Sequence, residues 1–368
     1  MRGCKDCGAD AAGLLGHCGR CIGRAAAGEL LRPHAITRRS LGLPPRVPRR
    51  GTVTCRLCAN RCAPGEGERG YCGLRTVRGG RLAYIWDSGA EKGLLHAYYD
   101  PLPTNCCASW FCGAGAGDNL AVFFYGCNFD CLFCQNAQHK HLDEGSIVTT
   151  GELAGMALAP RVTCVCFFGG SPEPQLPFAI RASREVIRRA EAAGRGIRIC
   201  WEWNGAGNPA LVRQAAGISL ATRGIVKFDL KAWDEKLALA LCGVPTRPSF
   251  DNFALVAEEF RAAADYPFLT ATTLLVPGYV DEDEVGRIAE FIASLSPEIP
   301  YSLLVFYPAY CMSDLPITPR EQAIRCYRAA REAGLVRVHV GNLHLLGLST
   351  EAFRALVGEE RAGDHADA

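Results

Sequence analysis

Three cysteines with C-x₃-C-x₂-C spacing lie directly after an apolar run of the chain. They are Cys127, Cys131 and Cys134, and the run extends from Asn119 to Tyr125. An apolar run of this length predicts a buried strand, so the thiols come just beyond a strand end. Three thiolates can bind three irons of a cubane cluster and leave the fourth iron open for a small-molecule ligand. Chance spacing among the twenty cysteines, or one half of a zinc site, are the other interpretations at this point.

Cysteine usage as a whole separates two classes of protein. Fourteen of the twenty cysteines come before residue 135, and many stand in C-x₂-C pairs. A secreted disulfide framework would use cysteine as heavily, but the N-terminal residues MRGCKDCGAD lack the apolar segment of a signal peptide. Metal and cluster ligation in a reducing cytoplasm is the better explanation, so we expect a cytoplasmic protein. The sequence has no run of eighteen apolar residues, which excludes a membrane span.

Length and charge indicate a globular protein without a general affinity for polyanions. The 368 residues suffice for one large α/β domain and one or two small modules. Lysine and arginine number 40 against 38 acidic residues, and the net charge of +2 gives no global field that would attract nucleic acid or a membrane.

The N-terminal residues 1–34 contain two C-x₂-C pairs separated by ten residues. The four cysteines are Cys4, Cys7, Cys18 and Cys21. Four thiolates in two tight turns suit a closed tetrahedral ion, with zinc as the first choice. A module of this size has almost no core and folds only with its ion, so we expect a structural or partner-docking role. A short helix is expected over 24–34.

A basic, proline-containing segment over 35–50 is expected to be a linker. Its arginines are Arg38, Arg39, Arg46, Arg49 and Arg50. The segment reads as a solvated tether, with a docking strip for an acidic partner as the alternative.

A second cysteine set lies in the module expected over residues 51–118. Its members are Cys55, Cys58, Cys62 and Cys72. These four thiols also match one closed metal site, for which zinc is the first choice and mononuclear iron the second. An auxiliary 4Fe–4S cluster satisfies the same ligands. Zinc is therefore expected in one or two tetrathiolate sites.

Three further thiols, Cys106, Cys107 and Cys112, stand just before a glycine-rich stretch. They could bind metal, relay a proton or hydrogen atom, or simply pack. Gly113, Gly115 and Gly117 resemble a phosphate-binding loop but follow no strand, so a flexible hinge explains them as well.

From residue 119 to 348 apolar runs alternate with amphipathic patterns. Strands are expected at 119–125, 162–168, 197–203, 224–230, 268–276, 301–306 and 336–340. Helices are expected near 151–158, 178–193, 208–216, 250–264, 281–295 and 319–333. This alternation indicates βαβ units, an α/β fold and a parallel sheet. A C-terminal helix and a disordered tail are expected over 349–368.

The cluster loop and the strand exits resemble those of the radical S-adenosylmethionine (SAM) family. Phe133 supplies the aromatic residue that the family signature places before its last cysteine, and Gly169, Gly170, Ser171 and Pro172 resemble its GGxP motif. The resemblance implies a partial (β/α)₆ barrel, a 4Fe–4S cluster on Cys127, Cys131 and Cys134, and SAM on the open iron. It also implies that carbonyls of the glycine motif accept hydrogen bonds from the SAM ammonium. Function in such barrels collects at the carboxyl ends of the strands.

Four more strand exits carry residues that the resemblance assigns to SAM or substrate. Glu202 and Asn204 in WEWNG, and Asp229 and Lys231 in DLK, would contact SAM. Val276 and Pro277 in LVPG would lie against the adenine. Tyr307 and Tyr310 would face the substrate side and donate a hydrogen atom or bind substrate, with an ordinary core or rim position as the alternative.

Residues 51–345 resemble the AmmeMemoRadiSam proteins and the pyruvate formate-lyase activating enzymes, whereas the first fifty residues and the tail after 348 are not covered. With the added thiols, the chain is most similar to archaeal enzymes that C-methylate a glutamine in the α subunit of methyl-coenzyme M reductase. That likeness implies cobalamin as methyl carrier, although the sequence has no cobalamin-binding Rossmann domain and no D-x-H-x-x-G motif.

The activity implied by the resemblance is radical chemistry on a protein or peptide. A reduced cluster, fed by a flavodoxin or ferredoxin, splits SAM, and the 5′-deoxyadenosyl radical abstracts a hydrogen. Other outcomes of the same chemistry are activation of a glycyl-radical enzyme, or C-methylation of another protein or a small molecule. A non-catalytic, metal-bearing assembly factor is the alternative from a different class.

Overall fold

A nine-stranded sheet forms the centre of the protein, whose computed structural model describes residues 2–86, 89–104 and 106–358. The strand order is β13-β12-β11-β10-β9-β8-β6-β5-β7. The strands from β13 to β6 are parallel to their neighbours, and β5 and β7 add an antiparallel edge. Their bounds are β5 Lys92–Pro101, β6 Asp118–Phe124, β7 Ser146–Thr149, β8 Val162–Gly169, β9 Arg198–Trp203, β10 Val226–Asp229, β11 Leu269–Leu275, β12 Tyr301–Val305 and β13 Val338–Gly341.

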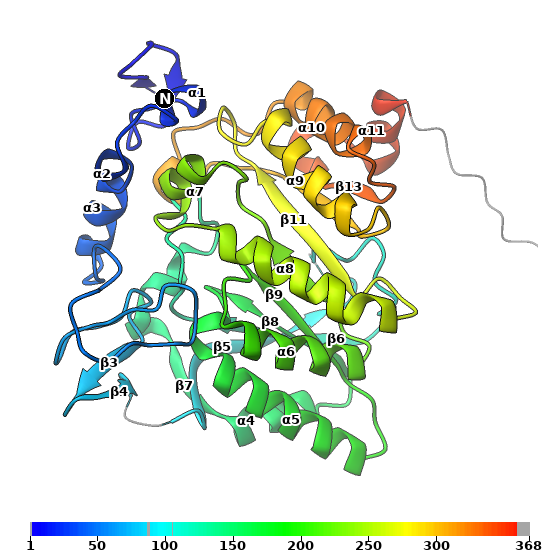
Figure 1. The fold of residues 1–368 in the computed structure, drawn as a ribbon. Coiled ribbons are helices and arrows are strands. Elements are labelled where there is room, and N and C mark those ends of the chain that lie inside the picture. Colours follow the sequence, from blue (N-terminus) through cyan, green and yellow to red (C-terminus); the bar gives the residue numbers. More distant parts are fainter. Residues whose placement is uncertain (1, 87–88, 105, 359–368) are drawn as a thin grey trace, which may run out of the picture.

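Helices connect the parallel strands and pack on the sheet, as Figure 1 shows. They are α4 Thr150–Ala157, α5 Leu176–Ala192, α6 Pro209–Ala221, α7 Glu235–Cys242, α8 Arg247–Phe260, α9 Glu282–Leu295, α10 Arg320–Glu332 and, after the last strand, α11 Thr350–Val357. Side-chain caps define several starts: Thr149 accepts from the Glu152 amide, and Asp281 accepts from the Glu284 amide at 3.2 Å. Every residue of β11 is buried, as expected for a parallel strand inside a sheet.

The α/β fold with a mostly parallel sheet is confirmed and is typical of the radical SAM partial barrel. Each expected strand overlaps an observed parallel strand, and each expected helix overlaps an observed helix. β5 and β7 were not predicted. The exposed half of β5 carries the polar and aromatic residues of HAYYDP, which give no apolar run to recognise.

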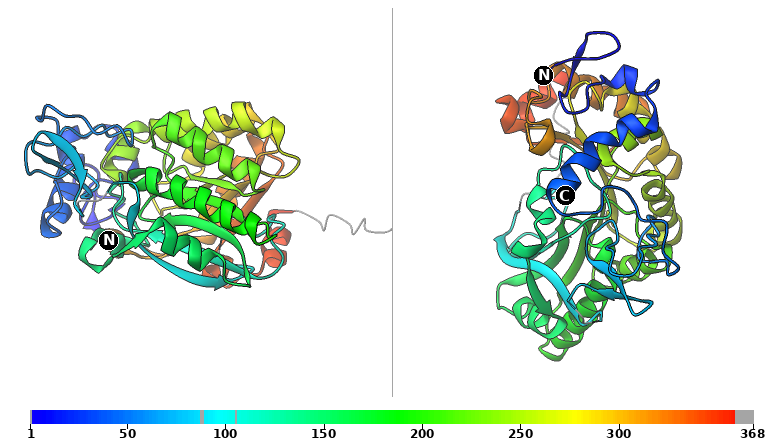
Figure 2. Two further views of the ribbon diagram at one scale, coloured as in Figure 1. Left: turned by 90° about the horizontal axis from the view of Figure 1, so that it is seen from below. Right: turned by 90° about the vertical axis from the view of Figure 1, so that its left-hand side faces the viewer.

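The N-terminal module packs against the loops at the carboxyl ends of the strands (Figures 1 and 2). It contains β1 Arg2–Gly3, β2 Asp10–Ala11, α1 Gly19–Ile22 and α2 Ala27–Leu30. The Gly19 amide donates to the Gly278 carbonyl at 3.2 Å, and the Ala12 amide donates to the Tyr279 hydroxyl at 2.8 Å. Both partners follow β11, so this module is fixed to the edge of the sheet where a site is expected.

The segment expected to be a linker over 35–50 differs from that prediction. Helix α3 extends from Arg32 to Ser40, and Arg38 is only 1% exposed. Its guanidinium is buried because it pairs with Asp130. Arg39, on the same helix, is exposed as expected. The basic segment is therefore not a solvated tether throughout: its first part anchors the N-terminus to the α/β domain.

The second module contains the hairpin β3 Arg75–Arg78 and β4 Arg81–Tyr84 and is attached to the exit of β9. The Ala59 amide donates to the Ala206 carbonyl at 2.9 Å, and the Asn208 amide donates to the Leu57 carbonyl at 3.0 Å. Helix α11 agrees with the expected C-terminal helix, while the expected tail over 359–368 lies outside the described residues. In the described part of the chain, no helix has the length and apolarity that a membrane span requires.

Candidate active site at the carboxyl ends of the strands

The loop from Cys127 to Cys134, called the cluster loop below, leaves β6 through a glycine turn. Gly126 has a φ of +76°, and a Cβ there would meet the Cys72 carbonyl oxygen at 2.9 Å. Only glycine allows this backbone and this close approach without strain. The Asp130 amide donates to the Cys242 carbonyl at 2.8 Å, and the Leu132 amide donates to the Leu241 carbonyl at 2.9 Å. The end of α7 therefore holds the loop from the other side.

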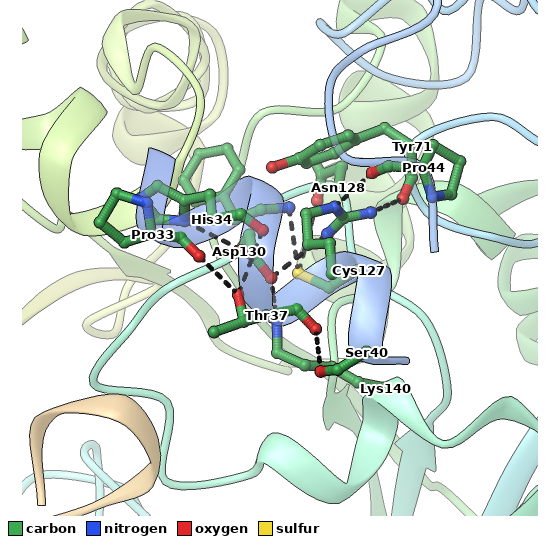
Figure 3. A network of polar contacts seen from close by, with 12 residues as sticks. Pro33, His34, Thr37, Ser40, Pro44, Tyr71, Cys127, Asn128, Asp130 and Lys140 are labelled. Atoms are coloured by element: carbon green, nitrogen blue, oxygen red, sulfur yellow. Dashed lines mark hydrogen bonds and ion pairs between the residues drawn. The ribbon is translucent and has the colours of Figure 1, made fainter. Parts of the chain in front are cut away.

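Asp130, between the first two cluster cysteines, is the centre of a buried charge network (Figure 3). Its carboxylate accepts from His34 Nδ1 at 2.9 Å and from Arg38 Nη1 at 3.2 Å, and it also pairs with Lys140. Burial opposes ionisation, but Lys140, His34 and Arg38 together hold the pKa of the Asp130 carboxyl below its ordinary value. One carboxylate thus faces two permanent cations, and the surplus positive charge lies beside the cluster thiols.

Arg38 connects this network to the N-terminal part of the chain. Its Nε donates to the Pro44 carbonyl at 2.6 Å, another guanidinium nitrogen donates to the Tyr71 carbonyl, and the guanidinium carbon lies 3.6 Å from the centre of the Tyr71 ring. The position of the cluster loop is therefore set by α3 and by the second cysteine module as well as by the sheet.

A cavity of about 140 Å³ lies against the cluster loop, where the strand ends converge. Its lining includes most of the residues that the sequence assigned to cluster and SAM: Cys127, Cys131, Phe133, Cys134, Gly169, Gly170, Ser171, Glu202, Asn204, Asp229 and Lys231. These residues come from the exits of β6, β8, β9 and β10. The fold therefore brings four separately placed motifs to one cavity, which we call the cluster cavity.

The glycine motif after β8 brings main chain to the edge of the cluster cavity. Gly169 has a φ of +104°, and a Cβ there would lie 2.7 Å from the Phe124 amide nitrogen. A Cβ on Gly170 would lie 2.4 Å from the Gly126 carbonyl oxygen. Two glycines are needed here because a side chain would push the strand ends apart. They also leave backbone groups accessible to a ligand.

A hydrogen-bonded chain of small polar side chains orders the wall next to this motif. Asn204 Nδ2 donates to Ser171 Oγ at 2.9 Å and to Asn128 Oδ1 at 2.7 Å. Glu173, which is fully buried, accepts from the Gly205 amide at 2.6 Å. The exit of β9 is thus fixed relative to both the glycine motif and the cluster loop.

Asp229 and Lys231 form an ion pair at the exit of β10. Burial opposes the charged form of Lys231, but Asp229 and Cys131 raise the pKa of its ammonium above the ordinary value, so the cation persists. The Lys231 Nζ also lies 5.6 Å from the centre of the Phe133 ring. A persistent cation in this cavity is suited to an anionic ligand group.

The structure adds residues to the cluster cavity that the sequence did not single out. Gln135, His139 and Trp203 line it, and each carries a buried ring or amide nitrogen without a hydrogen-bond partner among the described residues. Buried polar atoms are rarely left unpaired, so the Gln135 and His139 nitrogens fit a polar ligand in the cavity. The Trp203 ring instead packs against Trp201 and Phe228. Gln135 follows the last cluster cysteine directly, but nothing in the sequence marks His139 or Trp203 as different from core residues.

The chemistry of the donor set fits a 4Fe–4S cluster with SAM on its open iron. Three thiols provide three iron ligands, and the cavity beside them offers a cation, a carboxylate and unpaired nitrogens for a charged amino acid group. Burial raises the pKa of the Cys134 thiol to about 11, so iron would have to displace its proton. Cys242 places a fourth, fully buried thiol 3.7 Å from the Cys131 sulfur, an arrangement that the sequence spacing does not reveal.

Some expected residues lie elsewhere. Pro172, Val276 and Pro277 are not among the residues that line the cluster cavity. Val276 is buried in the core, and the turn after it supports the N-terminal module. Tyr310 is also outside the lining and places its ring 5.4 Å from the Lys140 Nζ.

A second, larger cavity of about 740 Å³ adjoins the cluster cavity. The two share five lining residues: Gln135, Asn136, Phe168, Glu202 and Leu304. Tyr307, 40% exposed, lines this larger cavity, and its expected place on the substrate side stays a prediction. We call it the substrate cavity because it has the volume typical of ligand sites and opens next to the cluster thiols.

The two four-cysteine sets differ in geometry. The sulfur atoms of Cys4, Cys7, Cys18 and Cys21 all lie within 4.8 Å of one another. A tetrahedral zinc ion with bonds of about 2.3 Å separates its sulfur ligands by about 3.8 Å, so this set can hold one ion. Cys55, Cys58, Cys62 and Cys72 line one small cavity of about 10 Å³. Among the described residues they do not gather within 4.8 Å in the same way.

Comparison with known proteins agrees with the site. Residues 121–292 match the family model of the radical SAM superfamily. The chain is 26% identical over 308 residues to the uncharacterised protein MJ0808 of Methanocaldococcus jannaschii, covering 79% of this chain and 81% of that protein.

Two solved structures are also similar. A domain of a pyruvate-formate lyase-activating enzyme from Bacteroides vulgatus has a TM-score of 0.35 at 23% identity, over 45% of this chain and 94% of that domain. Streptococcus suis SuiB bound to its precursor peptide SuiA has a TM-score of 0.46 at 15% identity, over 63% of this chain and 49% of SuiB. The match to the radical SAM family model covers the cluster loop and the exits of β8 to β11, which are the parts of the chain that line the cluster cavity.

Proposed function

We propose that this protein is a radical SAM enzyme that modifies a side chain of a protein or peptide. The observation that carries the proposal is the convergence of the three cluster cysteines, the glycine motif and the Asp229–Lys231 pair on one cavity that adjoins a larger one. When bound, a reduced 4Fe–4S cluster and SAM would supply a 5′-deoxyadenosyl radical that abstracts hydrogen from an unreactive C–H bond.

The residues of the chain would bind and orient the cofactors rather than transfer protons. Lys231, whose side chain is 13% exposed, would present a cation to the SAM carboxylate, and Asp229 would hold that cation in place. The carbonyls of the glycine motif would accept from the SAM ammonium, and Glu202, on the border of both cavities, would either reach the ribose hydroxyls or help to hold a cation. The surplus charge of Arg38 and Lys140 favours an anionic cluster on the loop.

The finer proposal is cobalamin-dependent C-methylation of a glutamine in the α subunit of methyl-coenzyme M reductase. It is supported by the likeness of the sequence to the archaeal glutamine methyltransferases and by a substrate cavity large enough for a peptide side chain. An sp³ carbon radical needs a donor that releases methyl homolytically, which is the role of cobalamin in this proposal. Cobalamin would bind at the mouth of the barrel, against the small flanking modules.

The first experiment tests the radical chemistry itself. The anaerobically reconstituted protein is mixed with SAM and reductant, and 5′-deoxyadenosine is measured against the Cys127→Ala variant. We expect formation by the parent and none above background in the variant. Absence of 5′-deoxyadenosine from a parent that holds four irons and sulfides per cluster would overturn the enzymatic proposal and leave a metal-bearing assembly role.

The second experiment separates methylation from activation of a glycyl-radical enzyme. A peptide with the target glutamine is added with methylcobalamin, and its mass is followed. A gain of one CH₂ unit that depends on both SAM and methylcobalamin supports methylation. A peptide that forms a glycyl radical, seen by electron paramagnetic resonance, without a mass gain would favour an activase.

A further inference from the structure

The substrate cavity is lined by six cysteines, none of which belongs to the cluster loop. They are Cys106, Cys107, Cys112, Cys164, Cys166 and Cys200. Side chains two apart on a strand share a face, so Cys164 and Cys166 of β8 point the same way. Cys166 lies opposite Cys200 of β9 in the sheet, and Lys227 of β10 lies opposite Glu202. One inner face of the sheet thus gathers soft and charged donors next to the added segment over 106–112.

Three of these donors already have the spacing of metal ligands. The sulfur atoms of Cys106 and Cys107 and a carboxylate oxygen of Glu202 lie within 4.8 Å of one another. Ligands of a tetrahedral zinc ion are about 3.8 Å apart, so a small adjustment of the side chains would complete the set. No other metal-spaced group among the described residues lies in the substrate cavity.

A buried lysine, Lys227, lies among these donors and favours their negatively charged forms. Lys227 is 3% exposed, and its Nζ lies 3.1 Å from Cys106 Sγ, 3.1 Å from Cys166 Sγ and 3.1 Å from Glu202 Oε2. A buried ammonium is costly unless anions surround it. The thiolates of Cys106 and Cys107 and the carboxylate of Glu202 would carry three negative charges, and Lys227 would offset one of them. A divalent ion would offset the other two.

The segment that carries the two cysteines is fixed to the sheet. Ser302 Oγ of β12 donates to the Cys107 carbonyl at 2.8 Å, and Trp110 Nε1 donates to the same hydroxyl at 2.9 Å. The Trp110 ring also stacks on His339 with centroids 5.2 Å apart. A rigid support of this kind is what a metal site needs, whereas cysteines that only fill a core gap do not require it.

We propose that Cys106, Cys107 and Glu202 bind a zinc-class divalent ion whose fourth position is open to the substrate cavity. Three protein ligands with one open position are the pattern of a catalytic or substrate-binding zinc site. The ligand taken at the open position is a neutral oxygen donor, such as the carbonyl of a peptide or side-chain amide. Lys227 acts as a positioning residue that orients Glu202 and Cys106. The ion would hold substrate beside Glu202, on the border of the two cavities.

The test is a thiol footprint on the full-length, cluster-loaded protein. The protein is treated with iodoacetamide after incubation with Zn²⁺ or with a chelator, and each cysteine peptide is quantified by mass spectrometry. Zinc is expected to slow alkylation of Cys106 and Cys107 at least about tenfold, because a metal-bound thiolate is a poor nucleophile. Cys112 lines the same cavity outside the metal-spaced group and serves as the control, with an unchanged rate.

Metal content gives an independent readout. The Cys106→Ser/Cys107→Ser double variant is expected to hold one zinc ion fewer than the parent, and Cys112→Ser the same number. The Cys131→Ala variant is expected to keep this zinc, so failure of the radical chemistry and failure of the zinc site are distinguishable. Equal alkylation with and without zinc would overturn the proposal, as would a Cys106–Cys107 disulfide in the isolated protein. Because the footprint uses the parent chain, the result stands even where a variant does not fold.

Discussion

The cluster cavity and the substrate cavity share a border, but their cysteines come from different kinds of sequence segment. The cluster cavity takes its sulfur ligands from one loop, Cys127 to Cys134, and its other polar groups from short motifs at strand exits. The thiols of the substrate cavity come from two neighbouring strands and from the segment over 106–112. Spacing along the chain reveals ligands that one loop supplies. It does not reveal ligands that are brought together by strand register.

The largest expected effect separates the cysteines of the two cavities. Cys131→Ala should abolish the cluster and reduce SAM cleavage to background, because only three protein ligands hold the iron. Cys166→Ala, which removes a buried thiol of the substrate cavity, should keep the iron, the sulfide and SAM cleavage. Iron analysis and 5′-deoxyadenosine formation measure both. Loss of iron from Cys166→Ala would show that the two cavities are one metal-binding unit.

Removal of the Arg38 side chain tests whether helix α3 stabilises the fold through its contact with the cluster loop. Arg38→Ala breaks a buried ion pair and should destabilise the protein by about 2–4 kcal/mol. The loss should not reach the upper end of the usual range because Lys140 and His34 still contact Asp130. Urea unfolding measures the free energy. Arg39→Ala, exposed on the same helix, should change it by less than about 0.5 kcal/mol. An equally small effect of Arg38→Ala would refute the anchoring role of α3.

Lys231 and the buried Lys227 should affect different sites, Lys231 the binding of SAM and Lys227 the zinc site. Lys231→Met removes a charge-assisted contact worth about 1.5–3 kcal/mol and should weaken SAM binding about 10- to 100-fold. Lys227→Met should leave SAM binding nearly unchanged and alter the zinc protection of Cys106 instead. Calorimetric titration of SAM into the cluster-loaded variants makes the comparison. If Lys227→Met weakened SAM binding and Lys231→Met altered the zinc protection of Cys106, the roles assigned to the two cavities would be reversed.

The smallest expected effect concerns the glycine motif after β8. Gly170→Ala should cost about 1–3 kcal/mol of stability, because the new Cβ would meet the Gly126 carbonyl oxygen at 2.4 Å. Gly155→Ala, within α4, has no atom within 4 Å of its Cβ and should stabilise by up to about 1 kcal/mol. Thermal and urea unfolding of both variants measure these changes in stability. A neutral Gly170→Ala would mean that the strand ends separate easily.

Much of the fold and the cluster cavity could be predicted because local patterns encode them. Apolar runs marked every parallel strand, and the polar residues after them marked the cavity wall. β5 escaped prediction because its exposed half lacks an apolar run. Arg38 looked solvated because its partner, Asp130, lies 92 residues away. Cys242 reaches Cys131 across 111 residues, and no local pattern records such a contact.

The LVPG segment has a structural contact in addition to the role that the resemblance assigned to it. Val276 and Pro277 were expected beside the adenine, but they do not line the cluster cavity. In this chain the following turn also accepts a hydrogen bond from Gly19 of the N-terminal module, and the Tyr279 hydroxyl bonds Ala12 and His17. The prediction of adenine contacts stays untested, and the segment has a docking role that the sequence did not suggest.

The Asp130 network also dictates an order of events during synthesis. His34 and Arg38 leave the ribosome early, but their shared partner follows 96 and 92 residues later. Until then α3 has no buried anion to pair with, and closing so long a loop carries an entropic cost that local helices do not pay. The first forty residues can therefore attach only after the cluster loop exists. Their arrival closes the charge network around the cysteines, so the N-terminal helix α3 takes its final place only after a partner that is synthesised 92 to 96 residues later.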